Sequence, residues 1–218
     1  MGRVLSVHTH CLLRIDSADA LRGETVPPRW VFERLARAPW VVVRRARHRD
    51  GCLPVGVRGA TRAERFAGWL RPESVRASLS PLQLAARRAW CSNARRAEVA
   101  ALAALDDVET IMERNGLGPS WGVAGSVAFE LASGCPTANG TSDLDLIVRL
   151  DARLAAMAAD ALLGELARLG ARADVLLETP AGGVALAEYA RARAPYLART
   201  PDGPRLRADP WAPPSAAA

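Results

Sequence analysis

The chain has 218 residues, of which half are hydrophobic, and a formal net charge of +6. This composition excludes a disordered chain and supplies enough apolar side chains for one or two domains with their own cores. All 29 basic residues are arginine, which suits bidentate contacts with phosphate. The charge favours phosphorylated ligands or an acidic partner protein. Nucleic acid is less favoured, because the arginines are spread along the chain rather than gathered in one arm.

The spacing of the cysteines and the lengths of the apolar runs indicate in which cellular compartment the protein works. Cys11, Cys52, Cys91 and Cys135 form no C-x-x-C unit, so neither a zinc ribbon nor a thioredoxin-type motif is expected. We find no signal-peptide pattern at the N-terminus and no uncharged apolar run near the ~20 residues that a membrane span needs. We therefore expect a cytoplasmic protein with reduced thiols and no membrane association.

Residues 1–78 are predicted to form a smaller N-terminal α/β domain. Trp40–Val43 and residues 53–57 have the apolar, β-branched character of strands. Asp50-Gly51 between them tolerates positive φ, which predicts a hairpin turn. Short helices are predicted over residues 29–38 and 61–70.

Residues 79–218 are predicted to form a second domain that begins with helices. Ser80-Pro81-Leu82-Gln83 has a capping serine, proline at the first helical position and a glutamine that completes a capping box. Helical sequence continues to about Arg114, with a break near residues 91–93. Asn115-Gly116 is expected to end it.

Strand and helix patterns then alternate, which predicts a β-sheet with helices packed on it. Asp151 is expected to cap the second of the predicted helices. Strands are predicted over residues 121–124, 143–150 and 173–178, and helices over residues 125–133, 151–169 and 180–193.

Asp143 and Asp145 are the most informative residues of the chain. They lie two apart at the start of an apolar strand, so both side chains project from one face, roughly 6–7 Å apart at Cα. Close like charges are costly unless they are neutralised, and a hard divalent cation such as Mg2+ prefers carboxylate oxygens. The pair therefore predicts a metal-dependent phosphate site.

Two further features are expected to meet this pair if the three predicted strands are neighbours. Gly125-Ser126 lies where a strand joins a helix N-terminus, a place where backbone N–H groups bind phosphate oxygens. Asp174 begins the third strand and supplies a third carboxylate. Together they predict a site for phosphoryl or nucleotidyl transfer.

These motifs resemble the DNA polymerase β-like nucleotidyltransferase superfamily. Within it, the chain is similar to the malonate decarboxylase holo-acyl-carrier-protein synthases, the phosphoribosyl-dephospho-CoA transferases. Their central block resembles residues 125–134 and 142–146 here, and their C-terminal block resembles residues 178–182, 186–189, 199–200 and 209–211. Leu176 departs from the family, whose third strand has glutamine there.

The resemblance implies a specific reaction. Members of the resembled family transfer a phosphoribosyl-dephospho-CoA group from triphosphoribosyl-dephospho-CoA to a serine of an apo acyl carrier protein. Mg2+ is the cofactor, and diphosphate is the leaving group. It implies a nucleotidyltransferase-type mixed sheet of the α+β class. Asp143 and Asp145 would be the metal ligands, Gly125 and Ser126 would hold the triphosphate, and Asp174 would be a ligand or a base.

Other interpretations remain open. The same motifs would serve a citrate lyase-type transferase or an adenylyltransferase, and the basic charge would also suit a non-catalytic binding module. Glu130 is more typical of a solvated or structural residue than of a catalytic one. Arg44, Arg45 and Arg58 either contact phosphates or are ordinary surface arginines, the latter being commoner.

Overall fold

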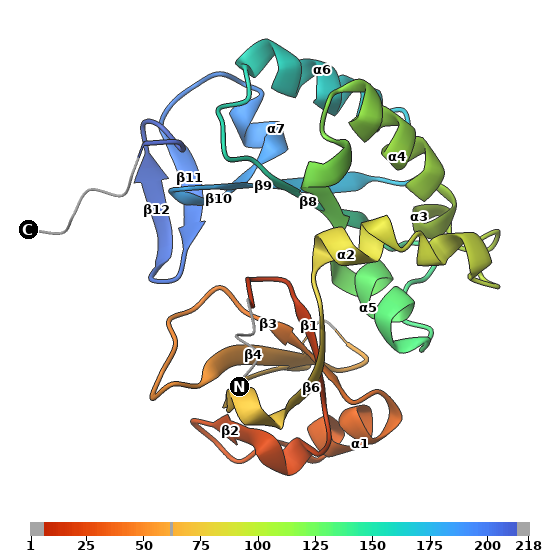
Figure 1. Ribbon diagram of the computed structural model, residues 1–218, viewed down its shortest axis with the longest axis vertical. Coiled ribbons are helices and arrows are strands. Elements are labelled where there is room, and N and C mark those ends of the chain that lie inside the picture. The colour runs from red at the N-terminus through yellow and green to blue at the C-terminus, as the bar shows by residue number, and fades with distance from the viewer. Residues whose placement is uncertain (1–6, 62, 213–218) are drawn as a thin grey trace, which may run out of the picture. The chain divides into compact units, whose positions relative to one another are not determined.

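The computed structural model describes residues 7–61 and 63–212, which fall into two compact units (Figure 1). The N-terminal unit comprises Met1–Ser80 with Ala132–Cys135, and the C-terminal unit comprises Pro81–Leu131 with Pro136–Ala218. Within the described residues, no helix combines the length and the apolar character that a bilayer crossing requires.

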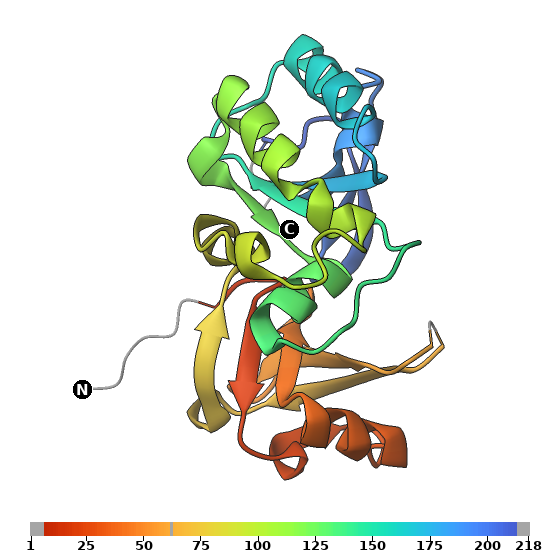
Figure 2. The ribbon, with the colours of Figure 1, turned by 90° about the vertical axis from the view of Figure 1, so that its right-hand side faces the viewer.

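The N-terminal unit is an antiparallel sheet with the strand order β2-β5-β4-β3-β1-β6. One helix, α1 (Arg29–Arg37), lies against one face of it (Figure 2). Asp50 and Gly51 both have positive φ, so the predicted hairpin turn between β3 and β4 is confirmed. The strands are β1 (Leu12–Ile15), β2 (Leu21–Gly23), β3 (Trp40–Val43), β4 (Leu53–Arg58), β5 (Arg65–Leu70) and β6 (Val75–Leu79).

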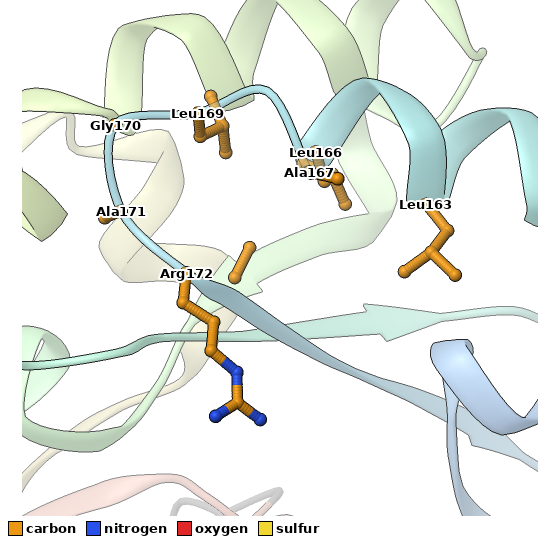
Figure 3. Close-up of a pocket in the computed structure, with 8 residues that line it drawn as sticks. Leu163, Leu166, Ala167, Leu169, Gly170, Ala171 and Arg172 are labelled. Atoms are coloured by element: carbon orange, nitrogen blue, oxygen red, sulfur yellow. The ribbon is translucent and has the colours of Figure 1, made fainter.

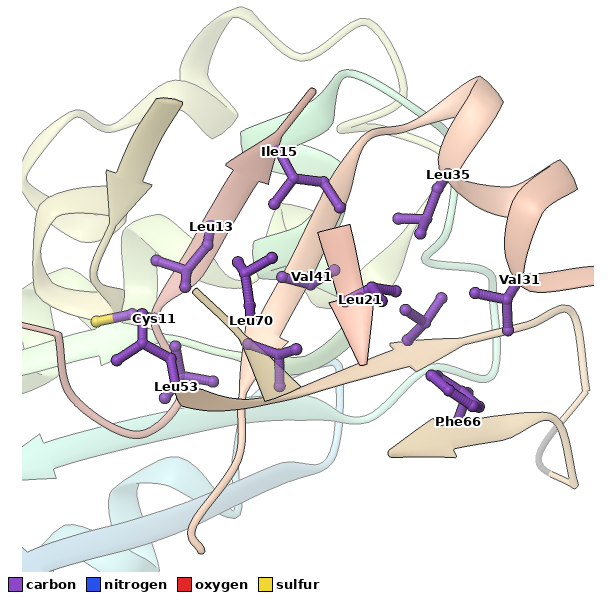
Figure 4. Close-up of a cluster of buried hydrophobic side chains, with 13 residues drawn as sticks. Cys11, Leu13, Ile15, Leu21, Val31, Leu35, Val41, Leu53, Phe66 and Leu70 are labelled. Carbon is purple, nitrogen blue, oxygen red and sulfur yellow. The ribbon is translucent and has the colours of Figure 1, made fainter. Parts of the chain in front are cut away.

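The core of this unit lies between α1 and the sheet (Figure 4). Val31 and Leu35 of α1 pack against alternate side chains of the strands, such as Leu13, Val41 and Val55. The predicted helix over residues 61–70 is wrong, because β5 occupies most of that range. Its burial alternates with a period of two, which is the pattern of a half-buried strand rather than of a helix.

The C-terminal unit begins with helices and continues into a mixed sheet with the strand order β12-β11-β10-β9-β8-β7. Asn115-Gly116 ends α4 as predicted, with Gly116 at a φ of +70°. The helices are α2 (Pro81–Ala86), α3 (Ala100–Ala103), α4 (Leu105–Arg114), α5 (Gly125–Ser133), α6 (Ala156–Leu166) and α7 (Leu186–Tyr189). The strands are β7 (Trp121–Val123), β8 (Leu144–Arg149), β9 (Ala173–Thr179), β10 (Gly182–Ala185), β11 (Tyr196–Thr200) and β12 (Gly203–Arg207).

Two predicted features of this unit are wrong. The run from residue 180 to 193 is not one helix: Thr179 donates a side-chain hydrogen bond to the carbonyl of Gly182 across a tight turn, and β10 follows. Gly182 has a φ of +127°, which a helix does not accommodate. Asp151 caps no helix, because α6 begins only at Ala156. The intervening segment is instead held at the carbonyl of Leu154, which accepts a hydrogen bond from the Tyr189 hydroxyl at 2.7 Å.

The neighbouring positions of β7, β8 and β9 are the feature that matters for function. β7 pairs with β8 in antiparallel fashion and β8 with β9 in parallel, as the predicted site required. Helix α2 begins directly against β7: a Cβ placed on Gly122 would lie 2.2 Å from the carbonyl carbon of Pro81. Glycine at this position therefore lets the backbone of α2 contact the sheet.

Gly122→Ala is expected to destabilise the protein by about 2 kcal/mol or more, because the added methyl group must displace the α2 backbone. Gly164→Ala is the control: this glycine lies in α6, and a Cβ added to it would have nothing within 4 Å, so alanine should stabilise by about 0.5–1 kcal/mol. Chemical denaturation measures both effects. Equal changes in the two variants would contradict the proposed contact.

Candidate active site

The parallel register of β8 and β9 brings two predicted carboxylates side by side. Asp145 and Asp174 are direct Cα partners, so their side chains leave the same face of the sheet about 5 Å apart. Asp143 lies just before β8 and, by the alternation of the strand, faces the same side as Asp145. Leu144 between them is fully buried on the other face. The structure therefore places all three carboxylates on one face of the sheet, at the N-terminal ends of β8 and β9.

Gly125 brings the N-terminus of α5 to the same place. The Ala124 N–H donates to the Asp145 carbonyl at 2.9 Å, and α5 starts at the next residue. A Cβ on Gly125 would lie 1.8 Å from Asp145 Oδ2, and the φ of Gly125 is +63°. Only glycine fits both conditions. The expected meeting of the Gly125-Ser126 turn with the aspartate strand is present.

The surface beneath the carboxylates is apolar. Ala124, which directly follows β7, forms a small buried cluster with Ile147 of β8 and Leu176 of β9. Ile147 and Leu176 are Cα partners two residues beyond Asp145 and Asp174, so they share the face that bears the carboxylates. Leu176, at which the chain departs from the resembled pattern, therefore has a packing role. It lowers the polarity next to the aspartates, where charge interactions are stronger than in water.

Asp174 is paired with a cation of the chain itself. Arg172 Nη2 lies 3.2 Å from Asp174 Oδ1, and about half of the Asp174 side chain is exposed. Among the described residues, no three His, Cys, Asp or Glu side chains form a ready-made metal cluster. The donor set nevertheless fits Mg2+, which binds through one or two carboxylates and keeps waters or substrate phosphates as its other ligands. Asp143 and Asp145 are the two that would hold it.

A buried ion pair fixes the segment between α5 and β8. Glu130, only 2% exposed, accepts hydrogen bonds from Arg95 Nη1 at 2.7 Å and from the N–H groups of Thr137 and Ala138 at 2.9 and 3.0 Å. Arg95 also donates to the Ala138 carbonyl. The Thr137 hydroxyl donates to the Ser126 carbonyl at 2.8 Å. Glu130 thus ties the turn of α5 that bears Ser126 to the segment that leads to Asp143.

Charge and burial act against each other at Glu130. Burial is the largest influence and raises the pKa of its carboxyl, but the N–H groups of Thr137 and Ala138 and the Arg95 guanidinium together hold that pKa below its ordinary value. The sequence suggested a solvated or structural role for Glu130, and the structural alternative is the one observed. Its partner Arg95 was not predicted, since no local pattern links side chains 35 residues apart. Arg172 was likewise missed, although its place two residues before Asp174 on one strand face was a usable signal.

The C-terminal block of the sequence supplies parts of β9, β10, α7 and β11 and the segment after β12, rather than any of the three site carboxylates. The Tyr189 ring packs on Tyr196 and Trp211, with centroids 5.3 and 5.0 Å away. Burial raises the pKa of the Tyr189 hydroxyl. Asp209 accepts a hydrogen bond from the Trp211 N–H, which with Arg153 lowers the pKa of that carboxyl.

A separate hollow of about 370 Å³ lies at the end of α6 (Figure 3). It is lined mainly by apolar residues of α6 and of the loop that follows, with Arg172 and Ala173 at the start of β9. None of the predicted site residues lines it. The hollow is therefore not the place where the carboxylates would act.

Glu130→Gln is expected to lower the free energy of unfolding by about 2 kcal/mol at pH 7, because it removes the charge of a buried carboxylate that accepts hydrogen bonds from Arg95 and from two backbone N–H groups. The folded-state pKa of Glu130 is below 4.5, so the contribution of the carboxylate is present above pH 4.5 and is lost as the pH falls through the folded-state value. Wild type and variant should therefore converge in acid. Denaturation measured between pH 3 and 7 checks this.

Glu165→Gln is the control for that experiment. Glu165 pairs with Arg114 at 3.0 Å, but the Arg114 side chain is 64% exposed, so the loss should stay below about 1 kcal/mol. A Glu130→Gln variant as stable as wild type at pH 7 would contradict the structural role of Glu130.

Comparison with known proteins identifies the family of the chain. The model of the phosphoribosyl-dephospho-CoA transferase MdcG C-terminal domain matches residues 82–210, and that of the MdcG N-terminal domain matches residues 8–81. A phosphoribosyl-dephospho-CoA transferase of Azotobacter vinelandii is 40% identical over 206 residues, which cover 93% of each chain. No solved structure matches.

Two further relatives carry the same name. The Pseudomonas putida protein is 38% identical over 190 residues, with 86% of this chain and 88% of the relative covered. The Klebsiella pneumoniae protein is 34% identical over 203 residues, with 93% and 95% covered. The matches span both units and include the carboxylate edge of β8 and β9, and the chain belongs to the phosphoribosyl-dephospho-CoA transferase (MdcG) family.

Proposed function

We propose that the chain transfers a phosphoribosyl-dephospho-CoA group from triphosphoribosyl-dephospho-CoA to a serine of the acyl carrier subunit of malonate decarboxylase, and that diphosphate is released. The observation that carries the proposal is the approach of Gly125 to Asp145, which sets a helix N-terminus beside the carboxylates. A polyphosphate bound to the N–H groups of α5 would lie next to Asp143 and Asp145. Membership of the transferase family supports the nature of the donor.

The transfer balances as a substitution at the α-phosphorus of the triphosphate. The serine Oγ of the carrier forms a bond to this phosphorus, and the bond from the phosphorus to the oxygen bridging to the β-phosphate breaks. The serine proton passes to a base, and Asp174, half exposed and directly opposite Asp145 on the neighbouring strand, is the carboxylate that we propose for this role. Asp174 is alternatively a third metal ligand.

Asp143 and Asp145 would hold Mg2+, the cofactor that we propose. When bound, this ion neutralises charge on the phosphate oxygens during transfer. The first amides of α5 have no acceptor within the helix, so they can donate to the triphosphate. Arg172 lies 3.2 Å from Asp174, which holds that carboxylate in place. The four free cysteines fit the proposal that the protein works in the reducing cytoplasm.

Asp143→Asn and Asp145→Asn are each expected to lower transfer at least about a hundredfold, because each removes a charge from the metal site. Intact-mass measurement of apo carrier protein, incubated with donor and Mg2+, follows the added group. Calorimetric titration with Mg2+ gives a second readout that does not depend on turnover. Asp160→Asn, at an exposed position of α6, is the control and should keep full activity. Retained transfer in either site variant would refute the metal assignment.

Gly125→Ala is expected to abolish transfer, because its methyl group would collide with Asp145 Oδ2. Gly116→Ala is matched to it: Gly116 has a φ of +70°, but a Cβ added there would have nothing within 4 Å. Both variants should lose about 1–2 kcal/mol of stability through the strained backbone. Only Gly125→Ala should lose activity, and equal activities would contradict the contact.

Tests with other donors and other carriers distinguish the proposed function from the alternative transferase activities. An adenylyltransferase would use ATP, and a citrate lyase-type transferase would prefer the citrate lyase carrier. Wild-type protein incubated with each nucleoside triphosphate and each carrier should modify the malonate decarboxylase carrier with the CoA-derived donor alone. Transfer of AMP from ATP would overturn the proposal.

A further inference from the structure

The net positive charge of the chain comes from the N-terminal unit alone. Residues 1–80 contain fifteen arginines and seven acidic residues, whereas residues 81–218 contain fourteen arginines and sixteen acidic residues. The N-terminal unit is thus strongly basic, and the unit that bears the carboxylates is slightly acidic. The basic unit lacks the aspartates of the candidate site, so its charge needs another explanation.

The basic residues extend over one face of the N-terminal sheet. Helix α1 covers the opposite face, where the core lies (Figure 4). On the other face, which we call the outer face, the antiparallel register pairs Arg22 with Trp69 and Arg58 with Arg65. Arg22, Arg58 and Arg65 are exposed. Small or apolar residues, Ala67, Gly56 and Val42, form the row between the arginines.

One arginine of the outer face is held in a fixed position. The stem of Arg44 lies over Gly56, since a Cβ there would be 3.2 Å from Arg44 Cδ. Arg44 Nε donates to the Val55 carbonyl at 2.9 Å, and the guanidinium lies 5.8 Å from the centre of the Trp69 ring. Arg49 lies 5.4 Å from the same ring. Two guanidinium groups thus lie against the same indole ring, and these contacts orient them in the absence of a partner protein.

A pair of arginines on the outer face lowers the stability of the sheet. Arg58 and Arg65 are direct partners on β4 and β5, and both are exposed. Like charges opposite one another across two strands destabilise a sheet. An arrangement that costs stability in the free protein is favourable when an anionic surface lies across it, because the partner neutralises both guanidinium groups.

We propose that the outer face, with Arg22, Arg44, Arg58 and Arg65, is the docking surface for an acidic face of the protein substrate. The inference rests on the proposed function, because it takes the carrier protein as the occupant. Arg22, Arg58 and Arg65 lie on β2, β4 and β5, and Arg44 directly follows β3; these four adjacent strands span roughly 14 Å. A basic surface of that width fits a folded protein better than a single phosphate group.

The double variant Arg58→Gln and Arg65→Gln tests the proposal. KM for the apo carrier should rise about tenfold, which corresponds to ~1.4 kcal/mol, while kcat and the KM for the donor stay unchanged. The difference from wild type should shrink at high salt. The melting temperature should stay the same or rise, because the repulsion between the two arginines is removed. The control is Arg191→Gln with Arg193→Gln, two exposed arginines of the other unit.

The outcomes separate this inference from the function on which it rests. A raised donor KM with an unchanged carrier KM would assign the face to the phosphates of the donor and overturn the proposal, as would unchanged values for both. Wild-type protein that modifies no carrier would refute the proposed function instead. Apo carrier titrated onto the protein without donor then still measures docking, and equal affinity of wild type and double variant would overturn it.

Discussion

The close approach of Gly125 to Asp145 is the constraint on which the candidate site depends. It requires a residue without a side chain, a left-handed backbone and a helix that starts directly at the end of β7. It sets the N–H groups of α5 against a carboxylate of β8. A phosphate and a cation can then share one small volume, because each neutralises the charge that would exclude the other.

The ion pair of Glu130 and Arg95 stabilises the segment between α5 and β8, and with it the approach of Gly125 to Asp145. A catalytic carboxylate needs solvent and substrate, whereas Glu130 is buried. Its Oε2 accepts hydrogen bonds from Arg95, Thr137 and Ala138, and its Oε1 accepts one from Asn93 at 3.5 Å. Its charge serves to order a loop that has no regular secondary structure of its own. The chain therefore uses carboxylates in two ways within one unit: Glu130 is paired and buried and gives rigidity, whereas the clustered, accessible aspartates are the ones to which we assign the proposed chemistry.

Sequence patterns predicted which side chains the structure brings together better than they predicted the elements around them. Asp143, Asp145 and Gly125 were found because strand alternation and a glycine at a strand–helix junction are local signals. The strand at residues 65–70 was missed because its alternation is interrupted by Gly68 and bounded by arginines. The hairpin after Thr179 and the pairing of Glu130 with Arg95 depend on contacts between distant segments, which a local pattern does not contain.

The parallel pairing of β8 with β9, which stands alone among the described strands of the C-terminal unit, also governs when the site forms. Parallel strands need a long crossover, here supplied by the segment that includes α6, so β8 cannot pair with β9 until that whole segment has been synthesised. Closing a loop of this length costs conformational entropy before the contact can form. The repulsion between Asp145 and Asp174 therefore arises only after the crossover has brought the two strands together.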